Sequence, residues 1–447
     1  MPVSDLTVGF APVARTTFDI PLAAELARRM RAALVGAGFT VIGDGALLTT
    51  LDEARAAAGT LSAASLDALL IFQATFADST LVTALAAEIG APLALWAVPE
   101  APTGGRLRAN ALCGIMLGGH ALRRAGRAYE AVYAGPDDPA ALSRLGALAR
   151  AGRAQRALSG ARIGRVGAHP DGFETCIPHA EALRETLGVR LVQFDLDTLF
   201  EQARAADPAA VEAVADALRG ALANLDALDA PATRGTLAAY VALRDLAAQE
   251  GLAGLAVRCW PQFFTELGCA ACGALSLLSD QRVPASCETD VNGAATLLLL
   301  QAISGGPAFD VDVVSVDFEA DTTVVWHCGK APLSMADPAF APRGTVHSNR
   351  LKPLLMEFPL KPGRVTLARL SEADGAFRLV IGAGEMLAAP PSFGGTSGVL
   401  RFDRPARAVL ETLLGEGLEH HLALTYGDHL DALLAFARLV DLPVLRL

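Results

Sequence analysis

The order of strand-like and helix-like segments most constrains what this chain of 447 residues can fold into. From Leu6 to about Pro99, short β-prone runs such as "LTVGFAP" and "PLALWAV" alternate with longer amphipathic segments, which is typical of a parallel sheet with crossover helices. After an alanine-rich helical connector, the same alternation restarts with "ARIGRVGA" and continues to Gly305. The pattern therefore predicts two Rossmann-like, doubly wound α/β domains, over residues 1–158 and 159–305.

Beyond about Gly306 the pattern changes. Strand candidates such as "FDVDVVSVDFE", "GRVTLARL" and "FRLVIGAGEML" follow one another, separated by turn sequences such as "LKPG" and "EADG". Helical periodicity returns only near the end, where Leu430, Leu433 and Ala437 lie on one helix face. Residues 306–447 therefore predict a mostly antiparallel, β-barrel-like domain that is closed by a C-terminal helix. The predicted fold class is α/β with this β-rich domain at the end.

Composition narrows the classes of function. The formal net charge is −11 and no cluster of Lys and Arg residues occurs, so no nucleic-acid partner is expected. No apolar run reaches the roughly 18 residues that a membrane-spanning helix needs, so no membrane partner is expected either. The N-terminus lacks the pattern of a secretion signal, and the seven cysteines form no regular framework. We expect a soluble, cytoplasmic protein with free thiols.

Two segments carry acids in positions that suit a functional site. In "ASCETDVNGAA", Glu288 and Asp290 lie between a strand-like turn and a helix start, which is where ligands bind in open α/β sheets. The alternative is that these acids only complement the positive end of the helix. In "SVDFEADTTVVWHCG", Asp317 lies in an apolar strand context and His327 ends the following strand. A buried acid there would need a paired charge or a cation, whereas the acids of the intervening turn are expected to be solvated.

Two adjacent histidines lie in a third segment, "GLEHHLALTYGDH". Because neighbouring residues of an extended segment point to opposite faces, at most one of His420 and His421 is expected to serve a given site. The alternative for each is a hydrogen-bonded core histidine. Together, the acids and imidazoles form an oxygen and nitrogen ligand set that suits Mn²⁺ or Mg²⁺ better than structural zinc. Two carboxylates at such an ion can move a proton between neighbouring carbons, which is sugar isomerase chemistry.

The motifs "CETDVNGA", "WHCG" and "HHLALTYGD" together resemble the L-fucose isomerase and L-arabinose isomerase superfamily, specifically its short L-fucose-isomerase-like branch. Softer matches such as "PVARTTFD" and "VRCWPQF" extend the resemblance over nearly the whole chain. The resemblance implies two α/β domains followed by a β-rich domain. It also implies a metal-dependent aldose–ketose isomerase, with Mn²⁺ as the expected ion, that binds a small sugar and assembles as a trimer or hexamer.

The resemblance further implies roles for single residues. Glu288 matches the family's metal-binding catalytic base, and Asp317 matches its second metal-binding acid/base. His421, in preference to His420, matches the C-terminal metal ligand. His327 matches a position that is a ligand in the arabinose isomerases, and here we expect it to line the substrate site.

The chain also departs from the family, and this leaves the sugar open. Asp317 is followed by Phe318 and Glu319 in a short loop, where fucose isomerases have a tryptophan and asparagines in a longer loop. Arg15 matches an arginine that can reach the substrate of a neighbouring subunit. One alternative is an isomerase of a modified sugar, sulfonated or branched, and another is a non-catalytic sugar-binding protein of the same fold. The runs "ISGGP" and "FGGTSG" lack the spacing of phosphate-binding loops, so no nucleotide cofactor is expected.

Overall fold

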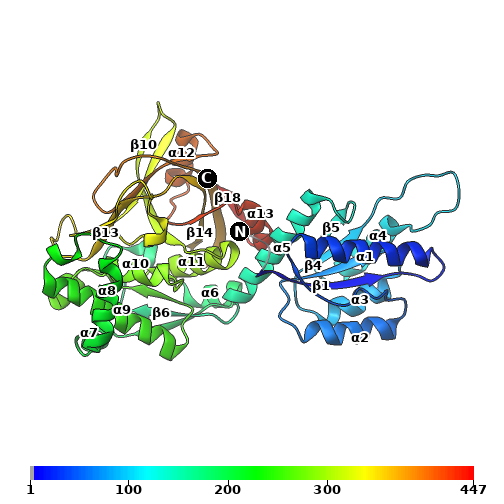
Figure 1. Cartoon of the computed structure of the whole chain (residues 1–447), viewed down its shortest axis with the longest axis horizontal. Helices are drawn as coiled ribbons and strands as arrows, with labels where there is room; N and C mark the ends of the chain where they lie inside the picture. Colours follow the sequence, from blue (N-terminus) through cyan, green and yellow to red (C-terminus); the bar gives the residue numbers. More distant parts are fainter. Residues whose placement is uncertain (1–4) are drawn as a thin grey trace. The chain divides into compact units, whose positions relative to one another are not determined.

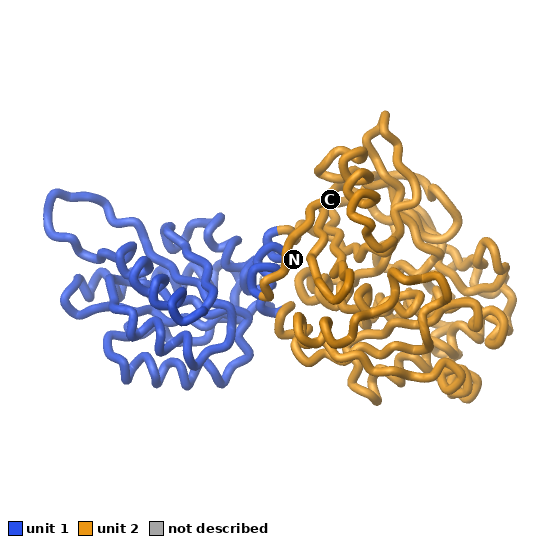
Figure 2. The backbone as a smooth tube through the Cα atoms, turned by 180° about the vertical axis from the view of Figure 1, so that it is seen from behind, with its two compact units in different colours: residues 1–153, 431–439 blue, residues 154–430, 440–447 orange. Residues whose placement is uncertain are grey.

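Residues 5–447 are described by a computed structural model, in which the chain forms two compact units (Figures 1 and 2). Unit 1 comprises the residues up to 153 together with 431–439, and unit 2 comprises residues 154–430 together with 440–447. The buried apolar side chains of unit 1 and those of unit 2 form separate cores.

A five-stranded parallel sheet forms the centre of unit 1, in the order β2-β1-β3-β4-β5. Every residue of β3 and β4 is buried, which explains why these strands are continuous apolar runs in the sequence. The strands are β1 (Thr7–Val13), β2 (Thr40–Ile42), β3 (Ala68–Gln73), β4 (Leu93–Ala97) and β5 (Glu130–Tyr133). The helices that alternate with them are α1 (Ile20–Gly36), α2 (Leu51–Ser62), α3 (Ser79–Glu88) and α4 (Ala111–Arg124), and α5 (Pro139–Leu158) continues into unit 2.

Unit 2 begins with a second parallel sheet of four strands, in the order β7-β6-β8-β9. Its strands are β6 (Arg162–Val166), β7 (Arg190–Phe194), β8 (Gly254–Val257) and β9 (Ala285–Ser286). Its helices are α6 (Ala180–Leu187), α7 (Leu196–Arg204), α8 (Pro208–Arg219), α9 (Ala230–Glu250), α10 (Cys272–Asp280) and α11 (Val291–Ser304). Short helical turns are η2 (Glu174–Cys176), η3 (Leu225–Ala227), η4 (Phe263–Leu267) and η5 (Leu333–Met335).

An antiparallel barrel forms the rest of unit 2. Its strands follow the order β16-β11-β10-β17-β14-β15, and the pairing of β15 with β16 closes the ring. The barrel strands are β10 (Phe309–Asp317), β11 (Thr322–His327), β14 (Gly363–Ala373), β15 (Ala376–Leu387), β16 (Thr396–Phe402) and β17 (His421–Tyr426). The elements beside it are β12 (Arg343–Thr345), β13 (Leu355–Pro359), β18 (Val444–Arg446) and α12 (Ala406–Gly415).

Helix α11 joins the two parts of unit 2. It contacts β8 and β9 of the parallel sheet and also β14 and β17 of the barrel. Nearly all of its residues are buried, as expected of a helix that is apolar on every face. The start of α11 therefore lies where the sheet and the barrel meet.

The architecture confirms the predicted fold class, with two parallel-sheet α/β regions followed by an antiparallel barrel. The C-terminal helix α13 (Leu430–Leu439) departs from the expectation, because residues 431–439 belong to unit 1 and not to the unit of the barrel. Leu439 packs against the core of unit 1, and Arg438 pairs there with Glu130 at 3.7 Å. An amphipathic pattern shows that a helix needs an apolar surface but not which surface it finds. Among the described residues, no helix has both the length and the apolar character that crossing a bilayer requires.

Candidate active site

Glu288 lies in the short connection between β9 and α11, at the carboxyl end of a parallel strand. Glu288 and Thr289 both have φ of +57°, a left-handed conformation that costs a non-glycine residue about 1–3 kcal/mol. Asp290 then caps α11, because its Oδ1 accepts a hydrogen bond from the Gly293 N–H at 2.8 Å. The helix-capping role that was the alternative for these acids thus applies to Asp290. The left-handed backbone at Glu288 costs stability, and such strain is typical of functional sites.

The Glu288 carboxylate is held from both sides. Its Oε1 accepts a hydrogen bond from the Trp260 indole N–H at 3.2 Å, and its Oε2 lies 3.0 Å from His420 Nε2 and 3.8 Å from His421 Nε2. Burial opposes ionisation, but the hydrogen bond from His420 and the charges of the two imidazoles outweigh it and lower the pKa of Glu288. The side chain keeps 16% exposure, so it is an ionised carboxylate that solutes can still reach.

His421 is oriented by a buried chain of charges. Its Nδ1 lies 3.0 Å from Asp290 Oδ2, and Asp290 is paired on its other side with Arg369. Asp290 and Arg369 have side-chain exposures of only 2% and 1%. Burial opposes ionisation of Asp290, but the charge of Arg369 and the hydrogen bond with His421 outweigh it and lower the pKa of this carboxyl. An ionised Asp290 keeps the proton of His421 on Nδ1, so that Nε2 presents a lone pair toward Glu288.

Two acids of β10 lie on the other side of His421. Asp312 is paired with His421 in the register of β10 and β17, and its Oδ1 is 3.9 Å from His421 Nε2. That oxygen is buried and has no hydrogen-bond partner among the described residues. Asp310 uses Oδ2 to accept hydrogen bonds from buried Lys330 and from the Ser286 hydroxyl at 3.1 Å, while its Oδ1 also has no partner among the described residues. Unpartnered buried oxygens are costly, so these two point to something that binds them.

His327 ends β11 beside this cluster, with its ring centroid 5.6 Å from that of His421. Its Nδ1 accepts a hydrogen bond from the Cys328 N–H at 2.8 Å, so the neutral ring carries its proton on Nε2. Nε2 is buried and has no partner in the part of the chain that is described. With this tautomer, His327 is arranged to donate a hydrogen bond from Nε2.

Both adjacent histidines approach Glu288, against the expectation that only one would serve the site. The alternation rule does not apply, because β17 begins at His421 and His420 precedes the strand. The two rings lie 4.1 Å apart between centroids. His420 Nδ1 contacts the Thr175 hydroxyl at 3.0 Å, which fixes the ring with its Nε2 toward Glu288.

Asp317, one of the predicted site residues, lies outside this cluster. Asp317 is exposed at the end of β10, where its Oδ1 accepts hydrogen bonds from the N–H groups of Glu319 and Ala320. Five extended residues place it about 16 Å along the strand from Asp312. Arg15 belongs to unit 1, where its guanidinium lies 5.9 Å from the centroid of the Phe76 ring. Asp312 was not predicted as a site residue, although the alternation "FDVDV" puts Asp310 and Asp312 on one face of the strand and could have drawn attention to both acids.

Aromatic rings and thiols surround the Glu288 carboxylate. Phe173 lies edge-on to both Trp260 and His420, at 5.2 and 5.9 Å between ring centroids. Cys176 is buried with its Sγ 4.0 Å from Glu288 Oε2. Burial and the charges of Asp290 and Glu288 raise the pKa of Cys176, so its thiol stays protonated. All seven cysteines are free, as the sequence predicts.

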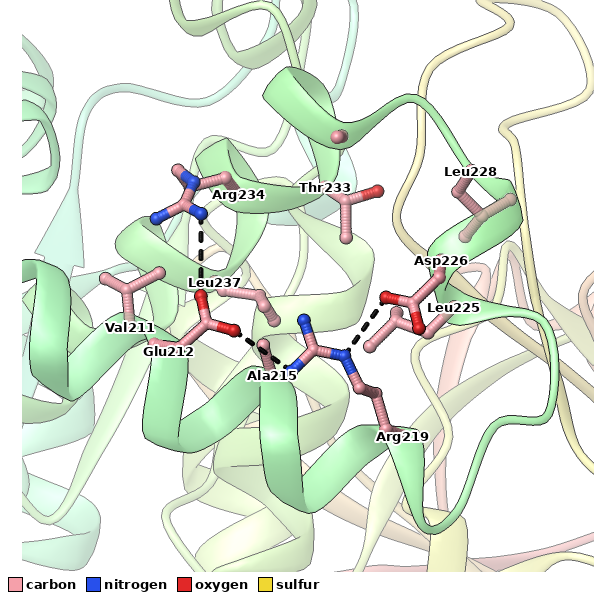
Figure 3. Close-up of a pocket in the computed structure, with 11 residues that line it drawn as sticks. Val211, Glu212, Ala215, Arg219, Leu225, Asp226, Leu228, Thr233, Arg234 and Leu237 are labelled. Atoms are coloured by element: carbon pink, nitrogen blue, oxygen red, sulfur yellow. Dashed lines mark hydrogen bonds and ion pairs between the residues drawn. The ribbon is translucent and has the colours of Figure 1, made fainter.

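A cavity elsewhere in unit 2 does not offer comparable chemistry. It lies among α8, η3 and α9, and Figure 3 shows that its charged side chains point toward one another. Arg219 pairs with Glu212 and Asp226 at 3.0 Å each, and Arg234 pairs with Glu212 at 3.5 Å. These exposed ion pairs neutralise one another, which is typical of a protein surface.

A parallel-sheet fold joined to an antiparallel barrel, with carboxylates and imidazoles gathered where they meet, is the arrangement that the family resemblance implies for a sugar isomerase. Sequence comparison agrees with this class. Residues 9–158 match the family described as fucose/sulfoquinovose isomerase, N-terminal domain, and residues 325–447 match L-fucose isomerase, C-terminal domain. The chain belongs to this L-fucose-isomerase-like family and is an isomerase.

Its relatives match over nearly their full length. The chain is 33% identical to a sulfoquinovose isomerase of Alkalicoccus urumqiensis, covering 99% of each chain. It is 31% identical to a sulfoquinovose isomerase of Priestia megaterium, covering 98% of this chain and 99% of the relative. A sulfoquinovose isomerase of a Clostridium species is 30% identical, with the same two coverages.

Proposed function

We propose that this protein interconverts the aldose and ketose forms of sulfoquinovose, a hexose with a sulfonate group on C6, and that it uses a divalent cation. The names of its relatives support a modified sugar as the substrate, in preference to fucose or arabinose. The reaction type is supported above all by one observation, the orientation of His421 by Asp290, which directs Nε2 toward Glu288 and Asp312.

His421 Nε2 faces two carboxylates that a cation could draw together. Glu288 Oε2 lies 3.8 Å and Asp312 Oδ1 lies 3.9 Å from this nitrogen, and the Asp312 oxygen is buried without a partner among the described residues. Two carboxylate oxygens and one imidazole suit Mn²⁺ or Mg²⁺, and we propose Mn²⁺ with Glu288, Asp312 and His421 as its ligands. A cation held there would polarise the C1 and C2 oxygens of the open-chain sugar.

Glu288 is the proposed base. In the proposed reaction it takes the proton from C2 of the aldose and returns it to C1, while a hydroxyl proton moves from O2 to O1. The sugar thus changes from aldose to ketose with no net gain or loss of atoms. The lowered pKa of Glu288 keeps it ionised, and its hydrogen bonds from Trp260 and His420 fix both oxygens while leaving lone pairs free.

Asp312 takes the second acid/base role that the family resemblance assigned to Asp317. Asp312 keeps 24% side-chain exposure, so a sugar oxygen can reach it, and it lies opposite His421 in the sheet. Asp317 instead stabilises an exposed turn. The unpartnered Nε2–H of His327 can donate a hydrogen bond to a sugar oxygen as the hydroxyl proton moves.

Exchange of the C2 hydrogen tests this proposal. The protein with Mn²⁺ and sulfoquinovose in heavy water is expected to incorporate deuterium at C2, and Glu288→Gln is expected to abolish the exchange with the fold intact. Asp312→Asn should lower the rate by about 100-fold or more, whereas Asp317→Asn serves as the matched control and should change it less than twofold. Exchange that persists in Glu288→Gln would refute the role of the base, and binding of the sugar without any exchange would favour a non-catalytic binding protein.

We also propose that the protein acts in the cytoplasm as a trimer or hexamer. Seven free thiols suit a reducing compartment, and the family resemblance supports closed homo-oligomers. Light scattering of the purified protein measures the assembly, and a monomer at micromolar concentration would contradict it.

A further inference from the structure

The segment between β12 and β13 holds an arginine with no acidic partner in the described part of the chain. The Cζ of Arg350 lies 5.0 Å from the centroid of the Trp260 ring and 5.1 Å from that of the Phe264 ring. The residue is half-buried, and among residues 5–447 no hydrogen bond or ion pair of its guanidinium is found. A cation on two aromatic faces is held in place by the rings, yet all of its N–H donors remain available.

The backbone around Arg350 is a compact turn. The Leu351 N–H donates to the His347 carbonyl at 2.8 Å, and the His347 N–H donates to the Lys352 carbonyl at 3.0 Å. The His347 ring lies edge-on to Phe264, at 5.1 Å between centroids. Because the backbone turn and the two rings both restrain Arg350, binding an anion would cost little further ordering.

Trp260 connects Arg350 to the reaction site. The same indole that supports the guanidinium donates its N–H to Glu288 Oε1 at 3.2 Å. The distance from the Arg350 Cζ to the Glu288 carboxylate cannot exceed the sum of these two contacts and the distance from the ring centroid to the indole nitrogen. The two groups therefore lie within about 12 Å of each other. An open hexose chain spans about 6 Å from C1 to C6, and a sulfonate with its hydrogen bonds extends it by several ångström more. A sugar whose C2 lies at Glu288 is therefore long enough to bring a C6 anion to Arg350.

We propose that Arg350, resting on Trp260 and Phe264, binds the C6 sulfonate of the substrate and so selects an anionic sugar over a neutral one. This inference rests on the proposed function, because it assigns the substrate's sulfonate to a residue of the same site. The planar fork of the guanidinium donates two parallel hydrogen bonds to oxyanions, and it is more weakly hydrated than an ammonium. A phosphate on C6 presents the same chemistry, so the two anions must be compared directly.

The test compares Arg350→Met, which keeps the apolar bulk without the charge, with Arg350→Lys and with the control Arg343→Met. Arg343 is exposed on β12 a few residues away, and no hydrogen bond, ion pair or ring contact of its side chain is found among the described residues. For each protein, kcat and KM are measured with sulfoquinovose, glucose 6-phosphate and glucose, and the dissociation constant of sulfoquinovose is measured by calorimetry.

We expect Arg350→Met to raise the KM and the dissociation constant for sulfoquinovose by about 10- to 100-fold, with kcat changed less than threefold. For Arg350→Lys, the KM and the dissociation constant for sulfoquinovose should lie between those of the wild type and of Arg350→Met. Arg343→Met should match the wild type, and the KM for glucose should be the same in all variants. Parallel loss with glucose 6-phosphate would show that the site reads anionic charge and not the sulfonate alone.

The outcomes separate this inference from the proposed function. Unchanged sulfoquinovose binding in Arg350→Met overturns the role of Arg350 even if the wild type is an active isomerase. Binding that depends on Arg350, without exchange at C2, overturns the proposed reaction but keeps the anion site. A wild-type protein that neither binds nor converts sulfoquinovose overturns both.

Discussion

Replacing Asp290 by Asn should damage both the stability of the protein and its affinity for a metal. Asn caps a helix as well as Asp does, so the bond to the Gly293 N–H can survive the change. The charge is lost, however, and Arg369 stays buried at 1% exposure. Among the described residues, only Glu419, 3.6 Å away, remains to compensate it. Removal of one partner from a buried ion pair costs about 3–5 kcal/mol, and because Glu419 offsets part of this we expect about 3 kcal/mol.

The same change should loosen the metal site. An amide at position 290 no longer holds the proton on His421 Nδ1, and loss of such an orienting partner lowers metal affinity by about 10- to 100-fold. Urea unfolding in the presence of a chelator measures the stability, and calorimetric titration with Mn²⁺ measures the affinity.

A matched variant controls for the helix cap. Asp229 caps α9 by accepting a hydrogen bond from the Ala232 N–H at 2.8 Å, and it is exposed with no basic partner among the described residues. Asp229→Asn should change the free energy of unfolding by less than about 0.5 kcal/mol. An Asp290→Asn variant that equals this control in stability, and the wild type in Mn²⁺ affinity, would refute the reasoning about the buried chain of charges.

Three further predictions concern metal, pH and oligomerisation. Adding Mn²⁺ at 100 times its dissociation constant should stabilise the wild type by about 2.7 kcal/mol in thermal unfolding, and His421→Gln should lose most of this gain. Burial lowers the pKa of His420, but the hydrogen bond to Glu288 and the charge of that acid outweigh it and raise the pKa. The stability that the charged His420 contributes is therefore fully present below about pH 6.5, and it is lost as the pH rises through the raised pKa of the folded protein. In chelated protein, the stability difference between wild type and His420→Gln should therefore shrink between pH 6 and 9, and a difference that is constant over this range would contradict the ion pair. Arg15→Ala should raise KM with unchanged stability if Arg15 serves a neighbouring subunit, and unaltered kinetics would remove that role.

The sequence predicted the fold because apolar periodicity is a local property. Continuous apolar runs marked the buried parallel strands, such as β3 and β4, and the change of pattern after Gly306 marked the barrel. The destination of α13 could not be predicted, because its apolar face fits any apolar surface.

The site was predicted only in part, for a similar reason. The positions of Glu288 and His421 lie in distinctive motifs, and the structure brings these two side chains together. The pairing of Asp312 with His421 depends on the register between strands far apart in the chain, which no local pattern reveals. Arg369 lies in the ordinary strand sequence "VTLARL", and nothing there shows that its charge is buried against Asp290.

The most direct test of the proposed centre is a crystal of the protein grown with Mn²⁺, examined by anomalous scattering at the manganese absorption edge. We predict one strong peak within bonding distance of Glu288 Oε2, Asp312 Oδ1 and His421 Nε2. A peak beside Asp317, or no peak near His421 at saturating Mn²⁺, would contradict the proposed metal centre.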